Sequence, residues 1–204
     1  MKHFVRALPL LLLFIFGTVD LAHAQGGSVY FGLGTADDKS SNQLLDVFGL
    51  GNPIGTPKMT GLFGTFGADA MFKPHLGFGG EVSLRFGKGA YSGLAYRPVF
   101  YDFNAIWQPL SVTQRVVPEF QAGLGGVKMS FYFSSSNPLT GTSNALVGAS
   151  SHFQLHGSGG IRFYVTPSVY IRPQVDVRYV PNFFQFGRNT VLEYTMAIGY
   201  SFGR

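Results

Sequence analysis

The sequence predicts an all-β fold, an eight-stranded antiparallel up-and-down transmembrane β-barrel, and three observations lead to this prediction. Eight segments alternate apolar and polar residues with a period of two, which is the period of a β-strand. Charged residues make up only 12% of the chain, against about 25% in soluble proteins. After residue 24 no stretch offers the roughly 20 consecutive apolar residues of a membrane helix. A closed barrel is the other structure that pairs all of its backbone groups in lipid.

The first residues have the pattern of a cleavable signal peptide. Lys2 and Arg6 precede an apolar stretch over residues 8–19, which is short for a membrane-spanning helix. Ala22 and Ala24 then place small residues before a cleavage site. An uncleaved N-terminal anchor helix is the alternative. The predicted division of the chain is a signal peptide over residues 1–24 and a β-barrel domain over residues 25–204.

The first four alternating segments place aromatic and aliphatic residues on one face and small or charged residues on the other. In the third segment, for example, Val82 and Leu84 alternate with Glu81, Ser83 and Arg85. The apolar faces are Val29, Phe31 and Leu33 in residues 27–35; Leu62, Phe66, Ala68, Ala70 and Phe72 in 59–72; Phe78, Val82, Leu84 and Phe86 in 76–87; and Val99, Tyr101, Phe103, Ala105 and Trp107 in 97–108.

The last four segments follow the same rule with one interruption. In the fifth segment the alternation slips at Gly125 and Gly126, which predicts a β-bulge. Beyond it we expect Val127 and Met129 on the apolar face and Lys128 on the polar face. The apolar faces are Phe120, Ala122, Leu124, Val127, Met129, Phe131 and Phe133 in residues 117–133; Phe153, Leu155, Ile161, Phe163 and Val165 in 152–165; Val169, Ile171, Pro173, Val175, Val177 and Tyr179 in 169–180; and Tyr194, Met196, Ile198, Tyr200 and Phe202 in 190–202.

The connections between these segments alternate between longer and shorter. Residues 36–58 and 134–150 are long and polar, whereas residues 73–75 and 166–168 are tight turns. This rhythm predicts strands that run up and down, with the long loops at one end. In outer-membrane barrels the long loops are extracellular and the short turns periplasmic, and the outer face of the wall is apolar. We therefore expect the apolar faces to meet lipid and the polar faces to point into the barrel.

Charged residues on the polar faces are predicted to fill the barrel interior. An eight-stranded barrel is just wide enough for its own side chains, and buried charges must be paired. We interpret these residues as a buried network of ion pairs, and the selectivity lining of a narrow porin-like channel is the alternative. Lys128 joins them beyond the predicted bulge. The predicted lumen charge network is Asp69, Glu81, Arg85, Asp102, Glu119, Arg162, Arg172, Asp176, Arg178 and Glu193.

The C-terminal stretch "EYTMAIGYSFGR" alternates apolar residues up to the aromatic Phe202. In this the chain resembles the small eight-stranded outer-membrane proteins of Gram-negative bacteria, the OmpA-like and OmpX-like barrels, and the resemblance covers everything after the signal peptide. Gly203 and Arg204 depart from the family pattern, in which the aromatic residue is terminal. The resemblance implies an outer-membrane location, recognition by the barrel assembly machinery during biogenesis, and contact with outer-membrane lipid and lipopolysaccharide.

Aromatic residues near the strand ends are predicted to form girdles at the two membrane surfaces. Phe131, Phe133, Phe183 and Phe184 are assigned to the outer girdle, with a sticky loop surface as the alternative. The predicted periplasmic aromatic girdle is Trp107, Tyr200 and Phe202.

His156 and Ser158 are a base and a nucleophile at strand spacing, since residues i and i+2 share a face. The pattern is similar to the His-x-Ser of outer-membrane lipid A deacylases, but Gly159 stands where that family has Asn. We interpret the pair as two polar residues of the interior, and a lipid A-modifying enzyme is the alternative.

Cysteine content and net charge exclude some classes of function. The chain has no cysteine, hence no disulfide and no Cys-based metal site. A formal net charge of +5 without a basic block gives no reason to expect nucleic acid. The sequence predicts no catalytic, cofactor-binding or metal-binding residues. We predict a non-enzymatic integral outer-membrane barrel with a structural, adhesive or surface-binding role through its extracellular loops, whose ligand the sequence does not identify.

Overall fold

The computed structural model describes most of the chain beyond the predicted signal peptide. That peptide, its cleavage site before Gln25, Phe184 and Arg204 lie outside the described residues. Within the described ranges, no helix is long and apolar enough to cross a membrane. The described residues are 26–38, 43–46, 49–91, 93–110, 114–137, 141–183 and 186–203, with the backbone alone for 134–137 and 141–144.

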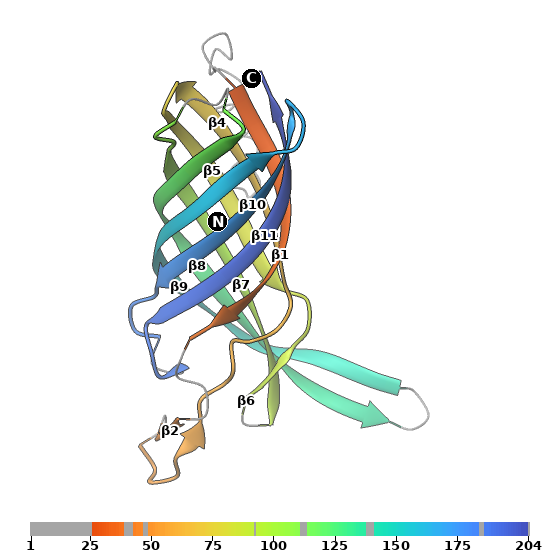
Figure 1. Ribbon diagram of the computed structural model, residues 1–204. Helices are drawn as coiled ribbons and strands as arrows, with labels where there is room; N and C mark the ends of the chain where they lie inside the picture. The colour runs from red at the N-terminus through yellow and green to blue at the C-terminus, as the bar shows by residue number, and fades with distance from the viewer. Residues whose placement is uncertain are drawn as a thin grey trace, which may run out of the picture.

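Eight antiparallel strands close into one barrel (Figure 1). Each barrel strand pairs with the next one along the chain, and the first pairs with the last, so the barrel wall is closed. The predicted up-and-down barrel is confirmed. The barrel strands are β1 (Gly26–Asp37), β4 (Phe63–Lys73), β5 (Leu76–Arg85), β7 (Leu94–Trp107), β8 (Val116–Asn137), β9 (Gly141–Tyr164), β10 (Val169–Tyr179) and β11 (Thr190–Phe202).

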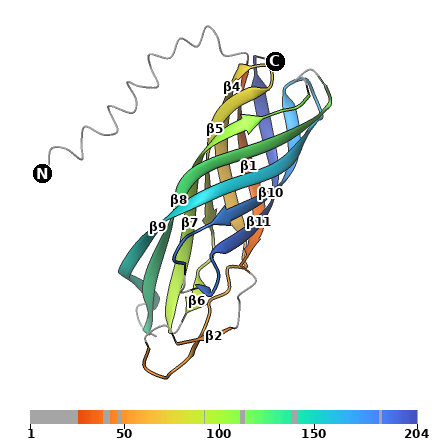
Figure 2. The same cartoon turned by 90° about the vertical axis from the view of Figure 1, so that its left-hand side faces the viewer.

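The two ends of the barrel differ in their connections (Figures 1 and 2). The short-turn end carries the connections over residues 74–75, 108–115 and 165–168. β1 begins and β11 ends there, since Gly27 pairs with Phe202. The loop end carries three shorter strands, the β8–β9 hairpin and the connection between β10 and β11. The shorter strands are β2 (Leu44–Leu45) and β3 (Ile54–Gly55), which pair with each other, and β6 (Gly89–Tyr91), which pairs with β7.

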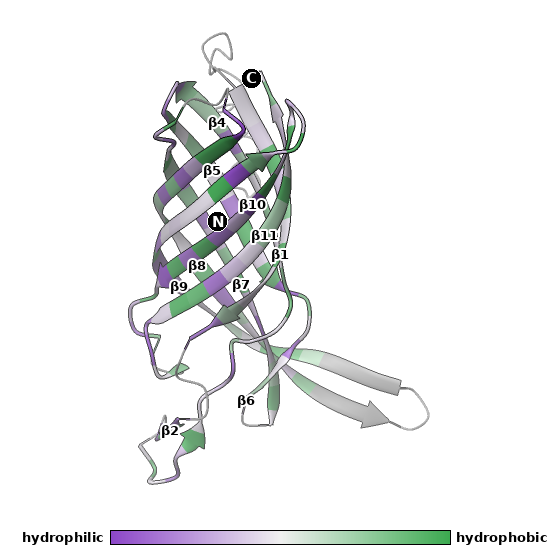
Figure 3. Ribbon diagram, viewed as in Figure 1, coloured by the Kyte–Doolittle hydropathy of each residue, from purple (hydrophilic) through white to green (hydrophobic). Residues whose placement is uncertain are grey.

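Strand residues alternate between the interior and the outer surface. In β10, Val175 and Val177 are 42% and 44% exposed, whereas Asp176 between them is fully buried. Figure 3 shows the same alternation of hydrophobic and hydrophilic residues along the other barrel strands. Contiguous apolar surface of this extent marks a membrane or protein contact, and a closed wall with apolar side chains outward suits lipid.

The prediction of a long loop over residues 134–150 is wrong. β8 and β9 continue as a hairpin beyond the barrel wall, with pairing as far as Asn137 and Gly141. Figures 1 and 2 show this hairpin projecting from the loop end. Its Ser- and Thr-rich sequence lacks the alternation of the barrel strands because it lies beyond the wall, where neither face is selected to meet lipid.

The predicted β-bulge at Gly125 and Gly126 is also wrong. Pairing with β7 and β9 continues through both glycines, and the register shift in β8 lies between Phe131 and Tyr132 instead. A Cβ on Gly125 would lie 2.0 Å from the backbone oxygen of Tyr101. Close packing against β7 therefore accounts for this glycine.

Because the alternation does not slip, the residues after the glycines face opposite to the prediction. Val127 and Met129 point inward and are fully buried, whereas Lys128 is exposed on the outer surface. Lys128 is therefore not one of the lumen charges. Apolar residues mark the outer face only where the interior is polar, and near the loop end the interior is apolar as well.

Candidate functional site in the barrel interior

The inward side chains form a charged layer in the body of the barrel. The exception among the predicted lumen charges is Arg85, which is half-buried at the loop end and donates to the Lys58 backbone oxygen and to Tyr96. The other nine are at most 7% exposed: Asp69, Glu81, Asp102, Glu119, Arg162, Arg172, Asp176, Arg178 and Glu193.

Toward the short-turn end, two arginines share one carboxylate. Arg162 donates to Asp69, with Nη2 2.8 Å from Oδ2, and forms a second ion pair with Glu119. Arg172 donates from Nη1 to Glu119 Oε1 at 2.6 Å. The Arg172 guanidinium also lies 3.9 Å from the centre of the Tyr30 ring, a cation–π contact. Both cations are therefore paired on this side of the interior.

Toward the loop end, Arg178 joins carboxylates from three strands. Its Nη1 lies 2.6 Å from Glu193 Oε2, and its Nη2 lies 3.1 Å from Glu81 Oε1 and 3.8 Å from Asp102 Oδ2. Ser83 also donates to Glu193 Oε1 at 2.5 Å. Each buried guanidinium thus has several partners, which is what a charge in a dry interior requires.

His156 lies between the two groups with both ring nitrogens engaged. Nδ1 is 2.8 Å from Asn104 Oδ1, and Nε2 is 3.0 Å from Asp176 Oδ1. Both ring nitrogens therefore have polar partners, and neither of these partners is Ser158.

The amide of Asn104 sets which nitrogen of His156 carries a proton. Asn104 Nδ2 donates to Asp102 Oδ1 at 2.5 Å and to Gln121 Oε1 at 3.2 Å, so Asn104 Oδ1 is left as an acceptor. Gln121 is oriented in turn, because its Nε2 donates to Glu119 Oε1 at 2.9 Å. The chain of donors therefore requires His156 Nδ1 to donate to Asn104.

An apolar cluster, here called the apolar plug, fills the interior at the loop end. Phe63 and Phe100 lie with ring centroids 6.3 Å apart, and Phe183 and Phe186 stack at 4.3 Å. The assignment of Phe183 to an outer girdle is wrong, because this side chain is fully buried. The plug consists of Ala36, Met59, Phe63, Tyr96, Phe100, Val127, Met129, Val180, Phe183, Phe186 and Val191.

The predicted girdle residues Trp107, Tyr200 and Phe202 lie at the outer surface near the short-turn end, as the last residue of β7 and two residues at the end of β11. Their side chains are 50%, 52% and 51% exposed. Trp107 stacks on Phe120 of β8, with ring centroids 5.6 Å apart. Their positions fit a girdle at this end, and that role stays a prediction.

No protein-family model matches this chain, and no curated protein matches it significantly in sequence. Solved structures that are similar in fold include three outer-membrane or surface proteins. The outer membrane protein OprG from Pseudomonas aeruginosa has a TM-score of 0.58 and 15% identity, covering 88% of this chain and 97% of OprG. Neisserial surface protein A has a TM-score of 0.56 and 14% identity, covering 88% and 98%.

The third structure is Ail, the attachment invasion locus protein of Yersinia pestis, in complex with the heparin analogue sucrose octasulfate. Its TM-score is 0.52 at 15% identity, and the match covers 87% of this chain and 98% of Ail. At this identity the similarity concerns the fold alone. The resemblance to small eight-stranded outer-membrane barrels is confirmed at that level.

Proposed function

We propose that this protein is a non-enzymatic integral outer-membrane barrel that binds a partner at the cell surface through its loop end. The observation that carries the proposal is the filled interior. A barrel that is closed to solutes leaves its wall and its loop end as the surfaces on which it can act.

Two layers of side chains support a closed interior. The charged layer spans the lumen through Arg178, which reaches Glu193 on the adjacent strand and Glu81 on another strand. The apolar plug closes the loop end with side chains such as Phe100 and Phe183, which are fully buried. A porin-like channel would need a continuous aqueous path through both layers, so the channel alternative is disfavoured.

The loop end supports the surface-binding role. The β8–β9 hairpin projects beyond the wall (Figure 2) and exposes Phe133, Leu146 and Val147 by 55%, 62% and 62%. Exposed apolar side chains on a projecting hairpin are typical of a contact surface. If the loop end faces outward, as in other outer-membrane barrels, this surface meets the exterior.

The charges at the loop end favour an anionic partner. Lys88 lies with Nζ 4.0 Å from the centre of the Tyr132 ring, and Lys128 is exposed on the neighbouring wall. The phosphorylated core of lipopolysaccharide is an anionic glycan in the same membrane and fits this surface. The described cations near the loop end are Lys58, Arg85, Lys88, Arg97, Lys128 and Arg188, against the acidic Asp37, Asp38 and Asp46.

A lipid A-modifying activity finds no support in the position of His156. Its side chain points into the barrel, away from lipid, and its nitrogens face Asn104 and Asp176. The proposal therefore gives His156 and Ser158 no catalytic role.

Single-channel recording of the refolded barrel in a planar bilayer tests the closed interior. We expect no stable conductance steps. A reproducible ohmic conductance would favour the channel alternative instead.

Binding of purified lipopolysaccharide tests the anionic partner. We expect the double variant Lys88→Glu and Lys128→Glu to bind at least several-fold more weakly at low salt, because charge attraction is screened by salt. The matched control is Lys73→Glu with Arg115→Glu at the short-turn end, which should bind as the wild type does. An equal loss of lipopolysaccharide affinity in both double variants would contradict a binding site at the loop end.

A further inference from the structure

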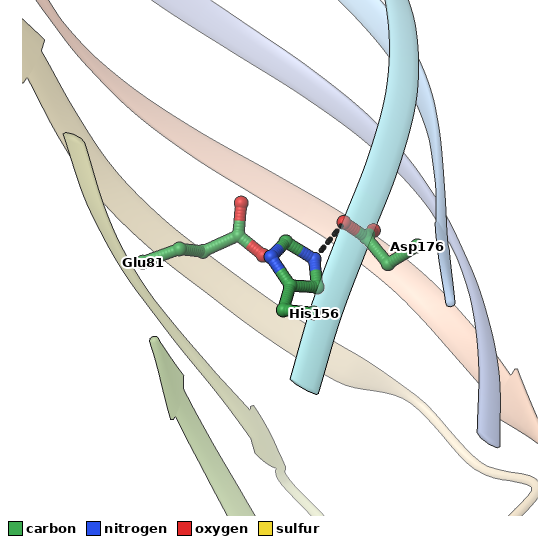
Figure 4. A group of neighbouring side chains, drawn as sticks. All are labelled: Glu81, His156 and Asp176. Atoms are coloured by element: carbon green, nitrogen blue, oxygen red, sulfur yellow. Dashed lines mark hydrogen bonds and ion pairs between the residues drawn. The ribbon is translucent and has the colours of Figure 1, made fainter. Parts of the chain in front are cut away.

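We propose that Glu81, His156 and Asp176 form a binding site for a divalent transition-metal ion of the zinc type inside the barrel. One ligand atom from each residue lies within 4.8 Å of the others, and all three side chains are buried. Figure 4 shows the three side chains converging from β5, β9 and β10. The sequence predicted no metal ligands, because these residues lie on separate strands without a ligand motif.

The orientation of His156 is that of a metal ligand. Metal-bound histidines usually donate the other ring N–H to a carbonyl or carboxylate oxygen. Here Nδ1 lies 2.8 Å from Asn104 Oδ1 and 3.4 Å from Asp102 Oδ1, both of which are acceptors. A neutral imidazole with its proton on Nδ1 turns the Nε2 lone pair toward Asp176.

The contact between Nε2 and Asp176 needs a cation. The two atoms are 3.0 Å apart, and two facing lone pairs repel at this distance. Either a proton or a metal ion relieves that repulsion. Two ligands that each lie about 2.0 Å from a tetrahedral zinc ion are themselves about 3.3 Å apart, which is close to the observed separation.

A buried oxygen without a partner points independently to a ligand. Asp176 is 0% exposed, and its Oδ2 has no hydrogen-bond partner among the described residues. A buried carboxylate oxygen is unfavourable unless it is paired or bound to a metal.

The charges of the described interior favour a bound cation. With His156 neutral, three guanidinium groups face six carboxylates, which leaves a formal charge of −3. A divalent ion offsets most of this excess. The charges are those of Arg162, Arg172 and Arg178 and of Asp69, Glu81, Asp102, Glu119, Asp176 and Glu193.

The donor set favours zinc or a similar ion. One imidazole and two carboxylates suit Zn²⁺ and its neighbours in the first transition series, whereas Ca²⁺ and Mg²⁺ take oxygen ligands. The ion would join three strands inside the wall. Its role is therefore structural, and it goes beyond the proposed surface-binding function.

The test uses the untagged full barrel refolded in detergent with Zn²⁺ or Co²⁺, followed by removal of loosely bound metal. We expect one metal ion per barrel by elemental analysis and a visible Co²⁺ absorption band typical of low coordination number. X-ray absorption of the zinc form should show imidazole scattering and nitrogen or oxygen ligands near about 2.0 Å. Wild-type barrel without stoichiometric metal would overturn the proposal in favour of a shared proton.

Variants identify the ligands. His156→Gln and Asp176→Asn keep the size and polarity of the side chains and should each lower the bound metal to less than about one tenth of the wild-type content. Asp69→Asn, a buried lumen carboxylate outside the cluster, should keep one ion per barrel. Full metal content in both cluster variants would contradict the site. If the cluster variants do not fold, the wild-type spectrum still decides, because the absence of imidazole scattering would contradict the proposed metal site.

Discussion

Arg178 on β10 donates from Nη1 to Glu193 Oε2 on β11 at 2.6 Å, and both side chains are fully buried. The same guanidinium reaches Glu81 on β5 with Nη2 at 3.1 Å from Oε1. It also lies 5.0 Å from the ring centre of Phe100, a member of the apolar plug. The charged layer and the apolar plug therefore meet at Arg178.

We expect Glu193→Ala to destabilise the barrel strongly. It leaves Arg178 buried with an incomplete set of partners, and breaking a buried pair in this way costs about 3–5 kcal/mol. Urea unfolding in lipid vesicles measures the loss. Glu193→Gln is the control and should lose less, because its amide oxygen keeps an acceptor for the Arg178 guanidinium. A loss for Glu193→Ala in the 0–1 kcal/mol range of an exposed pair would indicate a wet lumen and strengthen the channel alternative.

Val175→Arg tests whether the outer face of β10 meets lipid. A charge near the bilayer midplane costs about 2–4 kcal/mol on the barrel scale, and the same vesicle unfolding assay reports it. Leu146→Arg on the projecting hairpin is the matched control and should change stability by no more than about 0.5 kcal/mol. If Val175→Arg is as harmless as the control, the apolar face does not lie in the membrane.

Phe183→Ala tests the apolar plug. Truncation of a fully buried phenylalanine should cost about 3–5 kcal/mol, because it loses apolar burial and leaves a cavity. Phe133→Ala, on the exposed hairpin, should cost well under 1 kcal/mol in the same assay. If both substitutions lower the free energy of unfolding by a similar small amount, the apolar plug is not a tightly packed core.

The orientation of the barrel predicts where trypsin cuts intact cells. Lys58, Lys88 and Arg188 are exposed at the loop end, whereas Arg115 is exposed at the short-turn end. With the loop end outward, peptide mapping of intact cells should find cleavage after Lys58, Lys88 or Arg188 but not after Arg115, and permeabilised cells should add the Arg115 site. Cleavage after Arg115 in intact cells would reverse the orientation.

Signal-peptide cleavage is expected between Ala24 and Gln25. The intact mass of the membrane-extracted protein should correspond to residues 25–204. A mature species that retains Met1 would support the uncleaved anchor instead.

The period-two alternation by itself determined the barrel strands. Val175 and Asp176 show why. Each strand places apolar residues toward lipid and polar residues toward the interior, and this alternation can be read from the sequence of a single strand without knowledge of its neighbours. The same alternation correctly placed nine of the ten residues of the predicted lumen charge network, because the polar face of each strand points into the barrel. It placed Lys128 on the wrong side. Alternation fails where both faces are alike, as at Val127 and Met129 of the apolar plug, and along the polar β8–β9 hairpin.

The partners of each inward side chain were decided by the tertiary structure. Asp176 shares the inward face of β10 with Arg172 and Arg178, yet its Oδ1 contacts His156 Nε2 and accepts a hydrogen bond from Gln174. The alternation says which side of the wall a residue occupies and nothing of the direction in which its side chain crosses the lumen. That direction depends on barrel closure, strand stagger and the space left by inward glycines, which are properties of the whole wall. The cluster of Glu81, His156 and Asp176 exists only once the wall has closed.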